Sequence, residues 1–440
     1  MKGRIPGLIW SFAYVALIVA PLVVLGSGLV VARGAGWWFD FSMGLGFGAL
    51  ALMGGQFLLT ARFRRATAPF GMDVLYMLHR WLAVVGLLLV VAHYAILRVA
   101  YPRTLEPAWP GSAPFHMTAG RLALAIFVVL AASSLWRKAF GISYDRWRIA
   151  HIVLAVAGMV LAFVHVVGVG YHSGLFWTRI VLDLFMGSLI VIVAYVRVMK
   201  PIALTARPYR VTEVSPVRGR CWRLRLEPQG HDGFRFEPGQ FVWISLGRSP
   251  LRAQEHPFSI SGSAERAPAL ELTIKELGDF TGTIGKTEIG TVAYVDGPHG
   301  IFTVDRHPSA PGFLMIAGGV GIAPMVGMLR SMADRGDERP VRLVYGTHAW
   351  EATPLRDDLE ALEARMNLQV HYVFEEPHEG WEGAVGWPTP EFIRKALSEL
   401  PDGAQCFMCG PQPLTDMAQD ALVEAGVPLR SIHSELFQMA

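Results

Sequence analysis

The stretch HRWLAVVGLLLVVAH, residues 79–93, carries a histidine at each end of an almost wholly apolar run. A second stretch of the same length, HIVLAVAGMVLAFVH at residues 151–165, is built in the same way. Fourteen residues of α-helix advance about 21 Å and turn about 1400°, roughly 40° short of four full turns. Each histidine pair is therefore expected on nearly one face of its helix, near opposite edges of a hydrocarbon layer about 30 Å thick.

The first half of the chain is dominated by segments long and apolar enough to cross a bilayer, which takes about 20 residues of helix. The first of them follows Lys2 and Arg4, but it is longer than the apolar region of a signal peptide, so we expect a retained helix. The six predicted spans are residues 10–31, 41–60, 74–99, 118–136, 149–169 and 177–197.

Positively charged residues gather in the loops on one side of these spans, and such loops are normally cytosolic. We therefore expect a multi-pass protein of the cell membrane (plasma or inner membrane) with both termini in the cytoplasm. The third and fifth spans then run in the same direction. His79 is expected level with His151 near the cytosol, and His93 level with His165 nearer the exterior. The residues that set this orientation are Lys2, Arg4, Arg62, Arg64, Arg65, Arg137, Lys138, Arg146, Arg148, Arg197 and Lys200.

A polar ring inside a membrane is costly and usually functional, although a single histidine can simply be hydrogen-bonded across a helix pair. Four histidines at matched spacing favour two stacked haems with two axial histidines each, because neutral imidazole is a good haem ligand. Zinc would need ligands that converge on one point, and a proton relay remains an alternative. Arginines beside the two levels are candidates for propionate contacts: Arg80 and Arg148 at the inner level, and Arg98, Arg121 and Arg179 at the outer level.

The composition agrees with a membrane half joined to a soluble half. Of 440 residues, 52% are hydrophobic and 17% charged, against roughly a quarter charged in soluble domains. A net charge of +3 does not indicate nucleic-acid binding. All three cysteines, Cys221, Cys406 and Cys409, lie in the second half, which argues against a disulfide scaffold and fits a reducing cytosol.

The second half changes from short alternating strands to alternating strands and helices. Residues 207–307 predict a small antiparallel β-barrel, and the chain from residue 311 has the alternation of a doubly wound α/β nucleotide-binding domain. The expected domains are a six-helix transmembrane di-haem bundle at 1–200, an antiparallel β-barrel at 201–310 and a nucleotide-binding α/β domain at 311–440.

Short motifs in this half stand in an order typical of flavin reductases. HPFSIS (256–261) follows an extended strand, and AGGVGIAP (317–324) joins a strand to a helix. Glycine lets the backbone approach a pyrophosphate, and proline suits a first helical turn. With CGP (409–411), residues 207–440 resemble the ferredoxin-NADP reductase family. Together with the histidines, the whole chain resembles the NADPH oxidase and ferric reductase family.

The resemblance implies that the barrel at 201–310 binds FAD and that the α/β domain at 311–440 binds NAD(P), and it implies roles for particular residues. HPFSIS would line the flavin, the segment 271–284 would hold the FAD pyrophosphate, and Cys409 and Phe437 would lie at the nicotinamide and flavin rings. Residues near the end of the second α/β strand would contact the ribose, and no arginine typical of NADPH-selective members stands there. Cys406 and Cys409 in CFMC could alternatively form a redox dithiol. The flavin set is His256, Pro257, Phe258, Ser259, Ser261, Lys275, Gly278 and Thr281; the nicotinamide set is Gly318, Gly319, Gly321, Pro324, Thr347, His348, Cys409, Gly410 and Pro411, with Arg356 able to add charge.

These features predict a transmembrane NAD(P)H oxidase that passes electrons from NADPH or NADH through FAD and two b-type haems to outer dioxygen, giving superoxide. A flavin is needed because hydride carries two electrons and haem takes one. Ferric-chelate reduction, supply of electrons to an external protein, and a non-enzymatic channel with a sensor domain are the alternatives. Neither calcium nor an activator protein is expected to be required. Candidate residues at the outer opening are Arg98, Arg121, His116 and His172.

Overall fold

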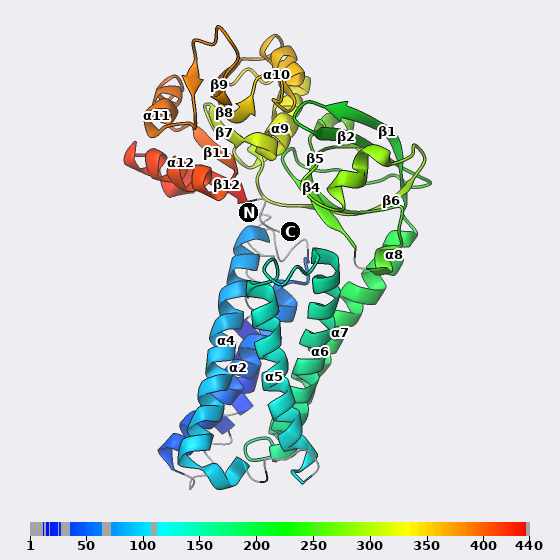
Figure 1. Ribbon diagram of the computed structural model, residues 1–440, viewed down its shortest axis with the longest axis vertical. Coiled ribbons are helices and arrows are strands. Elements are labelled where there is room, and N and C mark those ends of the chain that lie inside the picture. Colours follow the sequence, from blue (N-terminus) through cyan, green and yellow to red (C-terminus); the bar gives the residue numbers. More distant parts are fainter. Residues whose placement is uncertain are drawn as a thin grey trace. The chain divides into compact units, whose positions relative to one another are not determined.

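The computed structural model describes residues 12, 15, 16, 18–24, 26, 27, 36–63, 72–105, 107, 112–252 and 254–436. The chain divides into two compact units: residues 1–69 with 74–201, and residues 70–73 with 202–440. The first unit is helical, and the second contains both β-sheets (Figure 1).

Within the described residues, five helices are long and apolar enough to cross a membrane. They correspond to five of the six predicted spans. The predicted span at 10–31 lies partly outside the described residues, and those of its residues that are described are helical. The helices are α2 (Trp37–Leu59), α4 (Met72–Ala100), α5 (Phe115–Leu135), α6 (Tyr144–Val169) and a last span in which α7 (Phe176–Ala194) continues through a π-helical segment, η2 (Tyr195–Met199), into α8 (Lys200–Thr205).

Close packing in this bundle depends on small residues, as is usual where helices meet inside a membrane. A Cβ on Gly54 of α2 would lie 2.3 Å from Cζ of Phe185 on α7, so only glycine fits this contact. Phe47 and Leu50 of α2 and Leu182 of α7 complete the buried cluster. Helix α6 ends at Val169 and is capped by Gly170, whose φ of 68° turns the chain out of the helix.

The barrel of the second unit is a six-stranded antiparallel sheet in the order β4-β3-β6-β1-β2-β5. An isolated bridge between Ile260 and Leu272 joins the two edges and closes it. Side chains alternate along β2, where Leu224 and Leu226 are fully buried and Arg223 and Arg225 face outwards. The strands are β1 (Tyr209–Val217), β2 (Cys221–Pro228), β3 (Phe241–Leu246), β4 (His256–Ser259), β5 (Leu270–Lys275) and β6 (Val292–His299).

The C-terminal sheet is parallel throughout, in the order β10-β9-β8-β7-β11-β12. Met315 on β7 packs with α9 and α10, whereas the adjacent Ile316 packs with α11 and α12, so helices cover both faces. The strands are β7 (Phe313–Gly318), β8 (Val341–Ala349), β9 (Leu368–Glu376), β10 (Ala384–Val385), β11 (Gln405–Gly410) and β12 (Ile432–Leu436); the helices are α9 (Ile322–Arg335), α10 (Arg356–Glu363), α11 (Pro390–Ser398) and α12 (Gln412–Glu424).

The strand order reverses between β7 and β11. Sheets of this type bind ligands outside the carboxyl ends of their strands at the reversal. The predicted sequence of membrane bundle, barrel and α/β domain is therefore present, and the glycine-rich turn after β7 and the CGP motif after β11 lie on either side of the reversal.

We expect Leu226→Ala to destabilise the barrel by about 2–5 kcal/mol, because it opens a cavity around a fully buried side chain. Leu251→Ala, at a side chain that is 52% exposed in the same domain, is the control and should change little. Urea unfolding of the full-length protein in detergent measures both. Equal midpoints for the two variants would contradict this account of the core.

Candidate electron-transfer sites

His93 on α4 and His165 on α6 line one cavity of about 190 Å³ inside the membrane unit. Apart from these rings the wall is mostly apolar, with Leu50, Met53 and Phe127 among the lining residues. The level matching predicted from the spacing of 79–93 and 151–165 is therefore present at this depth. An apolar wall with two facing imidazoles is the environment that a haem needs.

The orientation of both rings is fixed by backbone carbonyls. Nδ1 of His93 donates to the carbonyl of Ser42 at 2.8 Å, and the Ser42 hydroxyl donates to the carbonyl of His93 at 3.1 Å. Nδ1 of His165 donates to the carbonyl of His116 at 3.0 Å. A carbonyl can only accept, so Nδ1 carries the proton in each ring and Nε2 keeps its lone pair for a metal.

Glycines lie directly against these rings. A Cβ on Gly120 of α5 would be 2.6 Å from Nδ1 of His165, and one on Gly46 of α2 would be 3.4 Å from the ring of His93. The first distance leaves no room for a side chain. Gly120 therefore sets how closely α5 approaches the histidine, and through it the position of the ring.

The second pair, His79 and His151, has ring centroids 6.3 Å apart. Imidazole nitrogens lie about 2.0 Å from a bound metal, so two axial rings have centroids roughly 6 Å apart. Nδ1 of His79 is buried and has no hydrogen-bond partner among the described residues, and Nδ1 of His151 is 3.4 Å from the Ser134 hydroxyl. The residues present fit a bis-histidine haem at this level as well.

The described part of the chain holds no group of three or more His, Cys, Asp or Glu side chains placed so that they could bind one metal ion. Zinc in proteins takes three or four such ligands at one point. Pairs of histidines at two depths agree better with haem.

The predicted outer arginines are placed differently from one another. Arg121 lines the cavity and donates to the carbonyls of Leu105 and Pro107. Arg98 is exposed on α4 and is not among the lining residues. Its neighbour Leu97 faces the cavity, and one residue turns a helix by about 100°, so Arg98 points away from it. Arg179 forms an ion pair with Asp183, 2.9 Å away, with both side chains half-exposed. Of these three, the structure brings Arg121 to the cavity.

His172 also reaches this cavity. It is 3% exposed, follows the turn at Gly170, and its ring lies against Tyr171 with centroids 4.6 Å apart. His116 contributes through its backbone carbonyl to the orientation of His165. Arg121 of α5 and His172 of the segment after α6 thus add polar groups to the cavity lining.

In the soluble unit, the HPFS residues form β4, paired with β3. The ring of His256 stacks on Phe280, with centroids 4.0 Å apart and planes at 15°. The Ser259 hydroxyl is buried and has no hydrogen-bond partner among the described residues, as expected of a group that faces a ligand. Pro257 and Phe258 lie between them on the same strand. These residues fit a flavin.

Two of the predicted flavin residues have local partners instead. The Ser261 hydroxyl bonds that of Thr273 at 2.8 Å inside the barrel closure. The Thr281 hydroxyl accepts from the N–H groups of Leu277 and Gly278 at 2.8 and 2.9 Å. These two N–H groups are already bonded, so Thr281 shapes the turn there. Lys275 stands at the end of β5, beside this turn.

The glycine-rich turn and the CGP motif contact each other directly. A Cβ on Gly321 would lie 2.2 Å from the carbonyl oxygen of Cys409, and one on Gly318 would lie 2.7 Å from Pro411. Gly319 has φ +54° and open space around it, and Gly410 packs on Gly318. Pro324 follows in the first turn of α9. The open space at Gly319, next to the N-terminus of α9, is suited to a pyrophosphate.

Cys409 is fully buried, and burial, with the nearby Glu435 carboxylate, raises its thiol pKa well above the ordinary value. Cys406 and Cys409 belong to the cores on opposite faces of the sheet, so the dithiol alternative is wrong. Glu435, which pairs with Cys409 across β11 and β12, is 6% exposed. Phe437 lies outside the described residues.

At the end of β8, Thr347 is buried and His348 is exposed. His348 lies 3.1 Å from the carboxylate of Glu375 and 3.5 Å from that of Glu376, both on β9. Arg356 stacks over the ring of Trp350, 4.2 Å from its centroid. Two carboxylates, those of Glu375 and Glu376, therefore lie beside His348 at the end of β8.

Several residues that contribute to these sites were not identified in the sequence: Ser42, Gly46, Gly120, Phe280 and Glu435. Ser42 and Gly46 are small residues four apart on one helical face, which is a known signal for close helix contact. Phe280 stands in the segment 271–284 that was singled out as a whole. No local sequence pattern identifies Glu435 as a site residue, because the site residue beside it, Cys409, belongs to another strand.

Three parts of the chain match known protein families. Residues 45–162 match the ferric reductase like transmembrane component, residues 209–300 an FAD-binding domain, and residues 315–420 an oxidoreductase NAD-binding domain.

Among similar proteins, NADH-cytochrome b5 reductase 1 of Scheffersomyces stipitis is 33% identical over 206 residues, which cover 45% of this chain and 71% of that protein. Ferredoxin–NADP reductase B of Sorangium cellulosum is 29% identical over 247 residues, covering 53% and 99%. The crystal structure of the cytochrome b5 reductase domain of Ulva prolifera nitrate reductase covers 52% of this chain and 97% of that one, with 22% identity and a TM-score of 0.46.

The fold and these matches define a multi-pass membrane oxidoreductase with FAD-binding and NAD(P)H-binding domains. The chain has the domain architecture of the NADPH oxidase and ferric reductase family, in which a ferric-reductase-like transmembrane domain is joined to a reductase module of the ferredoxin-NADP reductase type. Its architecture indicates electron transfer across a membrane at the expense of NAD(P)H.

We expect Gly120→Ala to reduce the haem content of the purified protein to about half, because its Cβ would displace His165. Gly187→Ala is the matched control, since a Cβ at this membrane glycine meets no atom within 4 Å. Haem content per protein is measured by the pyridine haemochrome assay. Equal haem content in the two variants would contradict the prediction that His165 is a haem ligand.

Because its pKa is raised, the Cys409 thiol should remain protonated between pH 7 and 9, where an exposed thiol of pKa about 8.5 becomes increasingly ionised. We expect negligible alkylation of Cys409 by iodoacetamide over this range in the native protein and rapid alkylation after urea unfolding. Mass spectrometry of the peptide measures both. A native alkylation rate that rises tenfold per pH unit would contradict a buried neutral thiol.

Proposed function

We propose that the protein is a transmembrane NAD(P)H oxidase, which uses cytosolic NAD(P)H to reduce dioxygen to superoxide on the outer side of the cell membrane. FAD and two b-type haems would be its resident cofactors, and a flavin supplies the conversion from a two-electron hydride to single electrons. The observation that carries the proposal is the pairing of membrane histidines at two depths, in one chain with a reductase module.

The residues of the soluble unit would bind and orient the nicotinamide and the flavin. The turn leaves open space beside the backbone at Gly319 for the pyrophosphate, and the adjacent Cys409 thiol would lie at the nicotinamide ring. On the flavin side, the Ser259 hydroxyl is available as a hydrogen-bond partner, and His256 and Phe280 offer stacked rings.

The residues of the membrane unit would hold the haems by Nε2 of His79 and His151 at one level and of His93 and His165 at the other. The carbonyls of Ser42 and His116 keep Nδ1 protonated in the outer pair, so that each Nε2 faces the metal. Beyond this pair, Arg121, Tyr171 and His172 give the cavity polar groups that could contact an acceptor.

Anaerobic and aerobic turnover of the full-length protein in nanodiscs tests this function. Oxygen consumption with superoxide formation on addition of NADH or NADPH, without calcium or a second protein, is the expected result. A rate that appears only with a ferric chelate would replace the oxidase by a ferric-chelate reductase. A rate that requires an external protein would indicate an electron-supplying subunit. Absence of a Soret band would end the haem proposal.

His93→Leu should remove the outer haem and abolish reduction of an outer acceptor, while reduction of the flavin by NADH stays within about twofold of the wild type. The physical reason is that the histidine lies in the membrane unit and the flavin site in the other domain. Haem content and anaerobic flavin bleaching are measured on the same preparation. Full haem content in this variant would show that the His93–His165 pairing is not a ligand pair.

We expect NADH to be preferred over NADPH, because the carboxylates of Glu375 and Glu376 next to His348 would repel a 2′-phosphate and can accept from a ribose hydroxyl. Glu375→Gln together with Glu376→Gln should raise kcat/KM for NADPH about tenfold, which corresponds to about 1.4 kcal/mol. Glu379→Gln, on the loop after β9, is the control. An unchanged NADH-to-NADPH ratio in the double variant would contradict this role.

A further inference from the structure

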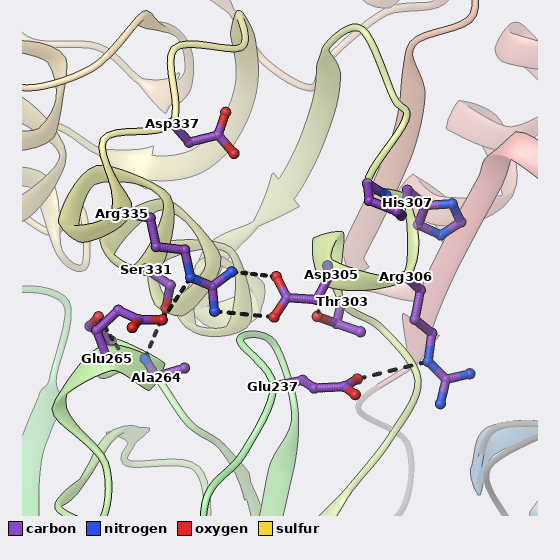
Figure 2. A network of polar contacts seen from close by, with 12 residues as sticks. Glu237, Ala264, Glu265, Thr303, Asp305, Arg306, His307, Ser331, Arg335 and Asp337 are labelled. Carbon is purple, nitrogen blue, oxygen red and sulfur yellow. Dashed lines mark hydrogen bonds and ion pairs between the residues drawn. The ribbon is translucent and has the colours of Figure 1, made fainter. Parts of the chain in front are cut away.

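Helix α9 links the nicotinamide turn to the flavin barrel. Its N-terminus follows the glycine turn, and its middle lies on the barrel residues that come directly after β4. A Cβ on Gly327 would be 2.4 Å from the carbonyl oxygen of Ile260, so the backbones are in contact. The Ser331 hydroxyl accepts from the N–H of Ala264 at 2.9 Å (Figure 2). One rigid helix therefore touches both proposed sites.

Four ion pairs form a closed ring next to this contact between α9 and the barrel. Arg330 of α9 lies 2.5 Å from Glu271 of the barrel and 2.5 Å from Asp358 of α10. Arg223 of the barrel completes the ring, 3.1 Å from Glu271 and 2.7 Å from Asp358. Each carboxylate thus bridges one arginine from each domain, and the four side chains are only 17–26% exposed.

Arg330 also contacts the residues that follow β4, the strand predicted to line the flavin. Its guanidinium donates to the carbonyl of Ser261 at 2.9 Å, two residues after the predicted flavin contact Ser259. The arginine therefore has three partners, two in the barrel and one in the α/β domain. Its planar fork fixes their relative directions in a way that a single ammonium group could not.

A second clamp lies one turn further along α9. Arg335 donates to Glu265 at 2.6 Å and to both carboxylate oxygens of Asp305 at 2.5 and 3.1 Å (Figure 2). Asp305 belongs to the short helix Val304–Arg306 in the segment that joins the barrel to β7. The C-terminal half of the helix is thus held on two sides, by the barrel and by the connecting segment.

Stability alone is a weak reason for such a ring. Ion pairs that are partly removed from water gain little net free energy, because desolvation offsets their attraction. The geometry of these charged hydrogen bonds is strict, however, so all four pairs form together at only one relative orientation of the barrel and the α/β domain. Helix α9 has 14 residues and is therefore about 21 Å long. A small tilt of α9 at its C-terminal half, which the ion pairs hold, therefore displaces the glycine turn at its N-terminus.

We propose that this ring, centred on Arg330, is a positioning device that holds the nicotinamide turn at hydride-transfer distance from the flavin. The inference rests on the proposed function, specifically on NADH reducing FAD between the two domains. It adds that domain docking, and not only cofactor contacts, sets the rate of hydride transfer. Misplacement of reacting groups by about 1 Å can slow a reaction about 100-fold.

The test is anaerobic stopped-flow reduction of the flavin by NADH in the full-length protein in nanodiscs. Arg330→Gln should slow flavin reduction at saturating NADH about tenfold or more and change the half-saturating NADH concentration less than about twofold. The isotope effect with NADH deuterated at the transferred position should increase. FAD content and melting temperature should match the wild type.

Arg342→Gln is the matched control. Arg342 is 16% exposed and pairs with Glu399 at 3.0 Å, but both residues lie within the α/β domain. Arg330→Lys, which keeps the charge and loses the fork, should give an intermediate rate. If Arg330→Gln does not fold, Asp358→Asn and Arg223→Gln carry the test, and their effects should be strongly non-additive because they break one ring.

The outcomes separate this inference from the proposed function. If NADH does not reduce the flavin of the wild type, the proposed function fails. If the wild type is reduced and the ring variants are no slower than Arg342→Gln, the positioning role is overturned and the proposed function stands. A slower rate that is explained by lost FAD or by a lower melting temperature also overturns it.

Discussion

An imidazole ring inside a membrane cannot exchange hydrogen bonds with water, and this constraint organises the whole helical unit. Each of the outer rings, His93 and His165, has its Nδ1 bonded to a backbone carbonyl from a neighbouring segment. The other nitrogen then has to find a partner elsewhere. In the proposed function, four rings at two depths on α4 and α6 would therefore define where the haems are held, and the apolar run between them would set the distance that electrons cross.

In the soluble unit, the proposed sites depend on glycines that have no space for a side chain. Gly321 and Gly327 have no space for a Cβ, because the backbones of Cys409 and Ile260 lie against them. At these positions the absence of a side chain allows one backbone to approach another. The proposed pyrophosphate surface and the docking of α9 on the barrel both follow from this close approach.

The two units meet different physical demands. In the membrane unit, position is fixed by helix packing and by carbonyls, since charged groups would be costly there. In the soluble unit, arginines and carboxylates such as Arg330 and Asp358 fix position instead. Partial exposure lowers the free-energy cost of burying these charged groups, and their hydrogen bonds are directional. An electron carrier needs fixed distances in both environments, and this chain obtains them by different means.

The sequence by itself determined the periodic and local features. The spacing of His79 and His93, repeated at His151 and His165, predicted the level-matched pairs because helical geometry converts residue number into depth. The order of membrane bundle, barrel and α/β domain followed from hydropathy and strand patterns in the same way. The tertiary structure alone decided the contacts between distant segments: Ser42 against His93, Glu435 beside Cys409, and the ring around Arg330. Such contacts depend on how helices and strands pack, and no local pattern records which surfaces will meet.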